Sequence, residues 1–175
     1  MITMTCNATL DLSGLQKLKD TLSDAKNARV NVGVFDTGNH DSGKSNATIG
    51  LAHEMGSNTG FSITSPKTGK TIHLSGFPKR SWLRMPLNDH LKDRMVEIGQ
   101  ATWDALINQH SLEYALIQLG FYGEETIREA FDTGGFGQWP PNSAKIIAWK
   151  GRNEPLVDTG ELRAAVASEV TGVAS

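Results

Sequence analysis

The chain has 175 residues, and 17 Lys and Arg against 19 Asp and Glu give it a net charge of −2 at pH 7. This length suits one domain with a real core and is too short for two. Without clustered Lys and Arg the composition argues against tight, non-specific binding to the outside of DNA, although such a protein can still line a channel through which DNA slides.

The single cysteine and the hydropathy of the chain restrict its class further. Cys6 has no second cysteine to pair with, which excludes an intramolecular disulfide and a Cys-based metal cluster. The N-terminus lacks the basic start and apolar run of a signal peptide, and no stretch approaches the ~20 apolar residues of a membrane span. We therefore expect a soluble protein of a reducing cytoplasm with no membrane contact.

The first third of the chain shows a helical pattern and then a strand pattern. Leucines at spacings of three and four predict an amphipathic helix over residues 12–22. Val30, Val32 and Val34 alternate with polar or small neighbours, which predicts a strand over residues 29–36. An exposed loop over 37–46 and a short helix over 47–55, ended by Gly56, follow.

Residues 61–74 have the pattern of a β-hairpin. Phe61 and Ile63 would lie on one strand, Ile72 and Leu74 on the other, and Gly69 supplies a positive φ for the turn. A long exposed hairpin in a small domain is often an arm for a neighbouring subunit. An ordinary edge hairpin remains an equal alternative.

Two long helices are predicted next. An apolar stripe from Leu87 to Leu106 indicates a helix that begins near Pro86 or Asn88, and Ser111 begins a second helix with a stripe to Phe131. Gly120 and Gly123 weaken the second helix by roughly 1 kcal/mol each relative to Ala. We therefore expect the backbone of another element to approach closely at these glycines.

A long loop is predicted over residues 132–158. Pro140 and Pro141 keep it extended or turning, and Trp139 is the large apolar group that pins it. Ile146, Ile147 and Trp149 are expected to form a short strand or an apolar clasp.

The C-terminal part predicts a helix and a strand. The helix covers residues 160–167, is capped by Asp158 or Thr159 and has Glu161 in its first turn. The strand lies near residues 166–173. The chain is therefore predicted to be one α+β domain, in which a small antiparallel sheet with a projecting β-hairpin packs against two long helices.

Residues 38–45 match G-x-x-x-x-G-K-S between a predicted strand and a predicted helix, the context that a phosphate-binding P-loop requires. Its cofactor-binding residues would be Gly38, Gly43, Lys44 and Ser45, with Ser45 as a ligand of Mg²⁺. The chain lacks an apolar run ending in a second magnesium-binding Asp, and it lacks the repeated strand–helix units of a parallel sheet. We favour an exposed loop, with the P-loop as an alternative.

Other catalytic and metal signatures are incomplete. His53-Glu54 lacks the second histidine of H-E-x-x-H, because Ser57 stands there, and the chain has no G-x-S-x-G. Helical carboxylates such as Asp93 and Glu97 fit solvated faces. We expect no enzyme, no metal and no cofactor.

Residues 77–84 (FPKRSWLR) combine aromatic and basic side chains, which is one pattern of a nucleic-acid surface. Because the chain has so little positive charge elsewhere, we favour packing of Trp82 and Leu83. Lys79, Arg80 and Arg84 would then meet acidic groups of neighbouring subunits.

Three segments together carry a family resemblance. Residues 49–56 (IGLAHEMG), residues 77–84, and residues 138–166 with a Trp-Pro-Pro loop before PLVDTGELRAAV occur in this order. The chain thereby resembles the tailed-phage virion-morphogenesis family of neck and tail-completion proteins, from about residue 30 to residue 166. In that family pattern His53 and Glu54 belong to a structural motif at the turn into the hairpin.

The resemblance implies a structural virion protein. Its subunits would form a homo-oligomeric ring, a hexamer where it meets the tail, which is assembled in the host cytoplasm and joins the tail to the head. Its partners would be connector and tail-tube proteins, and genomic DNA would pass through the lumen without sequence-specific binding. A tail terminator that stops tube polymerisation remains an alternative. The expected interface residues are Phe61, Ile63, Ile72, Leu74, Lys79, Arg80, Trp82, Arg84 and Trp139.

Overall fold

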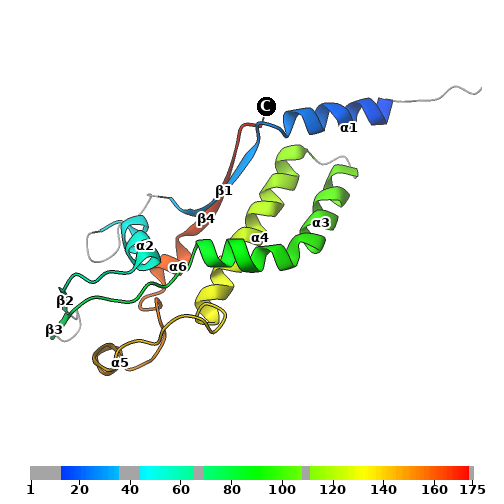
Figure 1. The fold of residues 1–175 in the computed structure, drawn as a ribbon. Helices are drawn as coiled ribbons and strands as arrows, with labels where there is room; N and C mark the ends of the chain where they lie inside the picture. The colour runs from blue at the N-terminus through cyan, green and yellow to red at the C-terminus, as the bar shows by residue number, and fades with distance from the viewer. Residues whose placement is uncertain (1–12, 36–43, 65–68, 108–110, 174–175) are drawn as a thin grey trace, which may run out of the picture.

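The computed structural model describes residues 13–35, 44–64, 69–107 and 111–173, and the fold is α+β, as predicted. In chain order the elements are α1 (Ser13–Asp24), β1 (Arg29–Val34), α2 (Asn46–Met55), β2 (Phe61–Thr64), β3 (Thr71–Leu74), the π-helical turn η1 (Pro86–His90), the 3-10 turn η2 (Leu91–Arg94), α3 (Met95–Ile107), α4 (Leu112–Asp132), α5 (Ala144–Lys150), α6 (Glu161–Ala164) and β4 (Val166–Thr171). Figure 1 shows α1 at one end of the molecule and the pair β2–β3 at the other.

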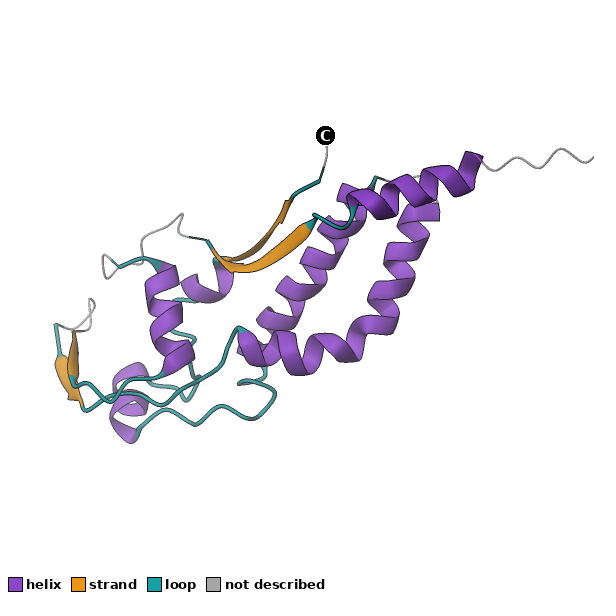
Figure 2. Cartoon of the chain, turned by 45° about the horizontal axis from the view of Figure 1, so that its top comes forward, coloured by secondary structure: helices purple, strands orange, loops and turns teal. Residues whose placement is uncertain are grey.

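Two small antiparallel sheets are present among the described residues. β1 pairs with β4 from Arg29↔Thr171 to Val34↔Val166, which confirms the sheet predicted from these two parts of the sequence. β2 pairs with β3 and places Phe61 opposite Leu74. Only the β1–β4 sheet lies against α4, and Figure 2 shows the β2–β3 pair apart from it.

Helix α4 packs closely on the β1–β4 sheet because two of its residues have no side chain. A Cβ atom at Gly120 would lie 2.5 Å from Ser168 Oγ, and one at Gly123 would lie 2.9 Å from Val32 Cγ2. Another element does approach closely at these glycines, but the expectation that its backbone would do so is wrong, because side chains of the sheet fill the space over the helix backbone. Ser111 caps the helix by accepting the N–H of Tyr114 at 3.1 Å.

The hydrophobic core lies where α4, α6, β4 and the loop after α4 meet. Its buried members are Trp82, Ile127, Ala130, Phe131, Trp139, Leu162 and Val166. The core therefore draws on segments that are far apart in the sequence, including the predicted long loop.

The predicted helix of about twenty residues from Pro86 is not continuous. A π-helical turn and a 3-10 turn precede α3. A π turn widens the helix and a 3-10 turn tightens it. Because the two deviations have opposite sense, the apolar spacing stays close to that of an α-helix, and the sequence pattern does not reveal them.

Of the two alternatives for Ile146 and Ile147, a short strand or an apolar clasp, the strand is wrong, because these residues lie in helix α5. Ser143 caps this helix by accepting the N–H of Ile146 at 3.4 Å, and Gly151 ends it with a φ of 78°. The two apolar residues have high strand propensity, but the capping residues on either side favour a single helical segment.

The last helix is also shorter than predicted. α6 covers four residues, and its N-cap is Gly160, with a φ of 87°, in place of Asp158 or Thr159. The chain leaves the helix before residue 166 because Val166 pairs with Val34 in the sheet.

Candidate functional site

The candidate site is a buried cluster that we call the motif junction, made of Gly50, Glu54, Arg80, Trp82 and Trp139. Each of the three segments that carry the family resemblance contributes to it. α2 supplies Gly50 and Glu54, the segment before η1 supplies Arg80 and Trp82, and the loop after α4 supplies Trp139. The junction thus joins residues that lie up to about ninety positions apart in the chain.

Glu54 lies in the last turn of α2 and is 4% exposed. Its Oε1 accepts hydrogen bonds from Ser81 Oγ at 2.6 Å and Arg84 Nε at 3.0 Å. Its Oε2 accepts the backbone N–H groups of Trp82 at 2.8 Å and Leu83 at 3.0 Å. One carboxylate therefore fixes four successive residues of the segment that leads to η1, in the manner of a helix cap.

The protonation state of Glu54 follows from these contacts. Burial alone would raise the pKa of the carboxyl, but the hydrogen bonds from Ser81, Leu83, Arg84 and Trp82 together lower the pKa below its usual value. The side chain is thus ionised at neutral pH and both of its oxygens are occupied. This arrangement suits a structural carboxylate and leaves no free oxygen position for acid–base work.

Arg80 fastens the Trp-Pro-Pro loop. It is 4% exposed, and its Nε donates to the Pro140 carbonyl while Nη2 donates to the Pro141 carbonyl, both at 2.9 Å. Its backbone N–H donates to the His53 carbonyl at 2.9 Å. The prolines have no N–H, but their carbonyls remain acceptors, and a planar guanidinium can reach two of them at once. Burial lowers the pKa of Arg80.

Trp82 and Trp139 complete the junction. Trp82 Nε1 donates to the Gly50 carbonyl at 2.8 Å, and Trp139 Nε1 donates to the Ser81 carbonyl at 3.2 Å. A Cβ atom at Gly50 would lie 2.6 Å from the Trp82 ring, so only glycine fits there. The Phe131 ring of α4 lies 5.8 Å from Trp82 and 5.6 Å from Trp139 between ring centroids. The two indoles thus bring the loop, α2 and α4 together.

His53, next to Glu54, is neutral at pH 7. Burial, and then the charges of Arg80 and Lys150, lower the pKa of its imidazole to about 4. Its ring lies 4.7 Å from the ring of Phe77. The residue therefore behaves as a packed aromatic group, which agrees with the structural role that the resemblance implies.

Three of the expected interface residues, Arg80, Trp82 and Trp139, lie inside the chain. All are buried and make the contacts described above, which agrees with the packing expected of Trp82 and the pinning of the loop expected of Trp139, and which places all three outside any exposed surface of the chain. Arg84 pairs with Glu54 of its own chain, although about half of its side chain is exposed, and Lys79 is exposed. The mixture of aromatic and basic residues did reveal an important segment, but its contacts are internal.

The expected interface residues of the hairpin lie on one face of β2–β3. Phe61, Ile63, Ile72 and Leu74 occupy alternate positions and are half-buried. The opposite face is polar and is paired across the strands, with Ser62 Oγ 2.6 Å from His73 Nδ1 and the Thr64 and Thr71 hydroxyls 2.8 Å apart. The pair therefore has one apolar and one polar face.

The possible P-loop is only partly within the described residues, because Gly38 and Gly43 lie outside them. Lys44 is exposed. Ser45 is the N-cap of α2, and its hydroxyl accepts the N–H of Thr48 at 3.2 Å. A P-loop would use this hydroxyl for Mg²⁺ and would follow a strand of a parallel sheet, whereas β1 pairs antiparallel with β4. The described part of the segment therefore favours the exposed loop, which ends at the N-cap of α2.

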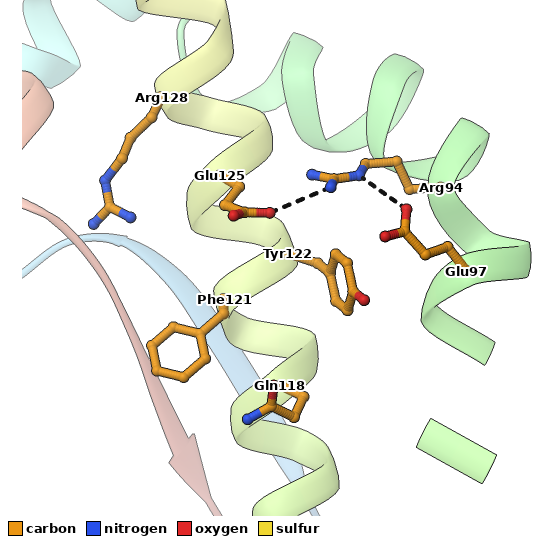
Figure 3. Close-up of a pocket in the computed structure, with 7 residues that line it drawn as sticks. All are labelled: Arg94, Glu97, Gln118, Phe121, Tyr122, Glu125 and Arg128. Carbon is orange, nitrogen blue, oxygen red and sulfur yellow. Dashed lines mark hydrogen bonds and ion pairs between the residues drawn. The ribbon is translucent and has the colours of Figure 1, made fainter. Parts of the chain in front are cut away.

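Sequence reasoning missed a surface hollow of about 560 Å³ beside α4 (Figure 3). Arg94 extends across it and forms ion pairs with Glu97 at 3.6 Å and Glu125 at 3.2 Å, while its guanidinium lies over the Tyr122 ring. Phe121 lies at its rim and is half exposed. Arg128, the fourth charged residue of the lining, pairs with Glu124 at 2.9 Å, so each charge at the hollow already has a partner within the chain.

Two further properties concern only the residues that the structure describes. They contain no group of three or more His, Cys, Asp or Glu side chains placed to hold a metal ion. No helix in the described ranges combines the length and the hydrophobicity that a membrane span requires.

Comparisons with known proteins do not assign a family. The chain matches no family model, no curated protein and no solved structure. A proposal about its function therefore rests on its residues and on their geometry.

Proposed function

We propose that the chain is a structural subunit of a tailed-phage particle that forms a ring at the head–tail junction. The ring would join the tail to the head and leave a lumen for the DNA. The observation that carries the proposal is the motif junction, in which the three segments that resemble the neck and tail-completion family bind one another through buried contacts.

The contacts of the junction explain why these short segments would occur together. Glu54 ties the first segment to the second, and Arg80 ties the second to the third. Buried polar groups need their partners, so each segment requires the residue types of the others. The meeting of all three segments at one buried site therefore supports the proposal.

A subunit of an assembly also fits the apolar surface of the chain. Val96 is 87% exposed and Leu51 is 64% exposed, and the aromatic rings of Trp103 and Phe121 are each half exposed. Large apolar side chains at the surface are typical of protein–protein contacts. A head-to-tail contact between such surfaces gives a closed ring when the rotation from one subunit to the next is a whole fraction of a full turn. In the family that the chain resembles, the ring that meets the tail is a hexamer.

A phage that carries a nonsense mutation in this gene provides the test. Electron microscopy of its lysates should reveal DNA-filled heads and tails of normal length that remain unjoined. Overlong tail tubes would identify a tail terminator instead. Intact, infectious particles would contradict both roles and would return attention to Lys44 and nucleotide binding.

A further inference from the structure

The β1 strand has an open edge beside an apolar hollow. The hollow has a volume of about 190 Å³ and is lined by Val30, Val32, Leu87, Leu91, Leu119 and Gly123. Its walls are β1 on one side and η1 with η2 on the other, and α4 forms its floor. No residue of β4 lines it, so it lies on the side of β1 that faces away from β4.

The hollow suits side chains better than a small ligand. Pockets for small molecules usually measure about 300–1,000 Å³ and contain a few polar groups. A cavity of about 150 Å³ with an aliphatic lining is large enough for a benzene-sized group. The hollow at β1 is slightly larger and is lined by aliphatic side chains, so it can take one or two apolar side chains from a neighbouring segment.

The backbone of β1 is open on the same side. Residues Arg29–Val34 pair with β4 along one edge, and no other described residue bonds their backbone N–H and C=O groups. The outer edge of β4 differs, because Arg128 Nη2 donates to the Val166 carbonyl at 2.7 Å. A third strand would therefore add to β1, where it would complete a two-stranded sheet and cover the hollow.

The sequence of residues 2–10, ITMTCNATL, has the pattern of such a strand. It lies outside the described residues. Apolar or small side chains occupy every even position and polar side chains occupy every odd position, and the even positions are Ile2, Met4, Cys6, Ala8 and Leu10. This alternation over nine residues predicts a strand with one apolar face and one polar face.

We propose that residues 2–10 of one copy add to the β1 edge of a second copy and place their apolar face in the hollow. A strand that adds to an open edge gains affinity from its main-chain hydrogen bonds and specificity from alternate side chains. Each copy would donate one strand and accept one. This is a head-to-tail contact, which generates a ring when it closes.

The position of α1 favours a second copy over the same chain. α1 extends away from the start of β1 (Figures 1 and 2). Its 12 residues span about 18 Å. A strand returning to its own β1 would use about five or six residues at ~3.3 Å each to cover that length. Residues 11 and 12 would be needed to reverse the chain, so only three or four of the nine would remain to pair with the six residues of β1.

The lone cysteine gives a direct test in the full-length chain. Residues that lie opposite one another in a sheet have Cα atoms about 4.5–5.5 Å apart, which is within the range for a disulfide. Val30→Cys, Val32→Cys and Val34→Cys would each place a second thiol on the hollow side of β1. Asn31→Cys is the matched control, because Asn31 faces the other side and donates to Glu169 at 3.1 Å.

The variants are oxidised as an equal mixture of ¹⁴N and ¹⁵N chains, and the Cys6 cross-links are identified by mass spectrometry. We expect mixed-isotope Cys6 disulfides with at least one hollow-side cysteine, several-fold above the Asn31→Cys control. Cys6→Ser in the same background should abolish them. Cross-links within one chain, none at any position, or equal yields at Asn31 and Val32 would each overturn strand exchange.

This inference shares only self-association with the proposed ring, and the two can fail separately. If the cysteine variants give no cross-link but electron microscopy shows rings, strand exchange is refuted and the proposal of a ring still stands. If the cross-link forms but the phage with the nonsense mutation is still infectious, the head–tail role is refuted and strand exchange is not.

Discussion

The Oε2 atom of Glu54 accepts the backbone N–H of Trp82 at 2.8 Å, across 28 positions of the sequence. The bond joins the end of α2 to the segment that enters the helical part of the molecule. With the bonds to Ser81, Leu83 and Arg84, it makes one ionised carboxylate a main link between the two parts of the chain on either side of β2–β3.

Glu54→Gln should therefore destabilise the protein strongly although it changes no volume. The amide presents an NH₂ donor where the carboxylate accepted hydrogen bonds, so buried N–H groups lose a partner. We expect a loss of about 2–4 kcal/mol in the free energy of unfolding, measured by urea denaturation. Glu129→Gln, on the exposed side of α4, is the control and should change this value by less than about 0.5 kcal/mol. Equal effects would contradict the role of Glu54.

Stability should fall on mild acidification because of His53. The pKa of the imidazole is lowered from 6.5 to about 4 in the folded chain, so between these pH values the unfolded chain binds a proton that the folded chain does not. The free energy of unfolding should drop by up to about 3 kcal/mol as the pH falls from 6.5 to 4. His53→Phe should flatten this part of the pH profile.

Gly123→Ala should destabilise the protein although alanine is the better helix former. The gain in helix propensity is about 1 kcal/mol, but the new methyl group would lie 2.9 Å from Val32 Cγ2, on a side chain that is stiff at χ1. We expect a net loss of about 1–2 kcal/mol in urea denaturation. Gly99→Ala in α3 is the matched control. It meets no atom within 4 Å and should stabilise the chain by up to about 1 kcal/mol.

Arg80→Lys should release the Trp-Pro-Pro loop. A single ammonium group cannot reproduce the two guanidinium bonds to Pro140 and Pro141. We expect faster proteolysis near residues 138–142 in the folded protein, measured with a low protease concentration. Lys79→Arg, a change of equal size at the exposed neighbouring position, should leave the cleavage rate unaltered. Unchanged proteolysis in both variants would show that the bonds from Arg80 do not hold the loop.

The hairpin arm can be tested apart from the rest of the fold. Deletion of residues 64–70 should leave a folded chain that no longer enters particles, because β2–β3 lies apart from the core. Ile63→Ser with Ile72→Ser should reduce incorporation through the apolar face alone. Ser62→Ala with His73→Ala, on the polar face, is the control. Normal incorporation of the deletion variant would refute the arm.

Local sequence patterns identified the elements in which buried side chains recur at regular spacings along the chain. Val30, Val32 and Val34 predicted β1, and Ser111 marked the start of α4, because alternation and capping depend on residues within a few positions. The glycine pair in α4 even predicted a close approach. The identity of the approaching residues, Val32 and Ser168, required the structure.

The motif junction could not be predicted in the same way. The partners of Glu54 and Arg80 lie 27 to 61 positions away, and no local spacing encodes them. Trp82 and Trp139 posed a further difficulty. A large aromatic group with one polar atom fits a buried site with a hydrogen-bond partner and an exposed interface equally well, so composition did not separate the two.

The close contact between α4 and the sheet links the choice of residues at four positions. The space over Gly120 is filled by Ser168, and the space over Gly123 is filled by Val32. In related chains, a larger residue at either helix position is expected to coincide with a smaller one at its sheet partner, such as alanine at position 123 with alanine or glycine at position 32. Each pair should vary as a unit during evolution, and an engineer who redesigns the helix must redesign the strand with it.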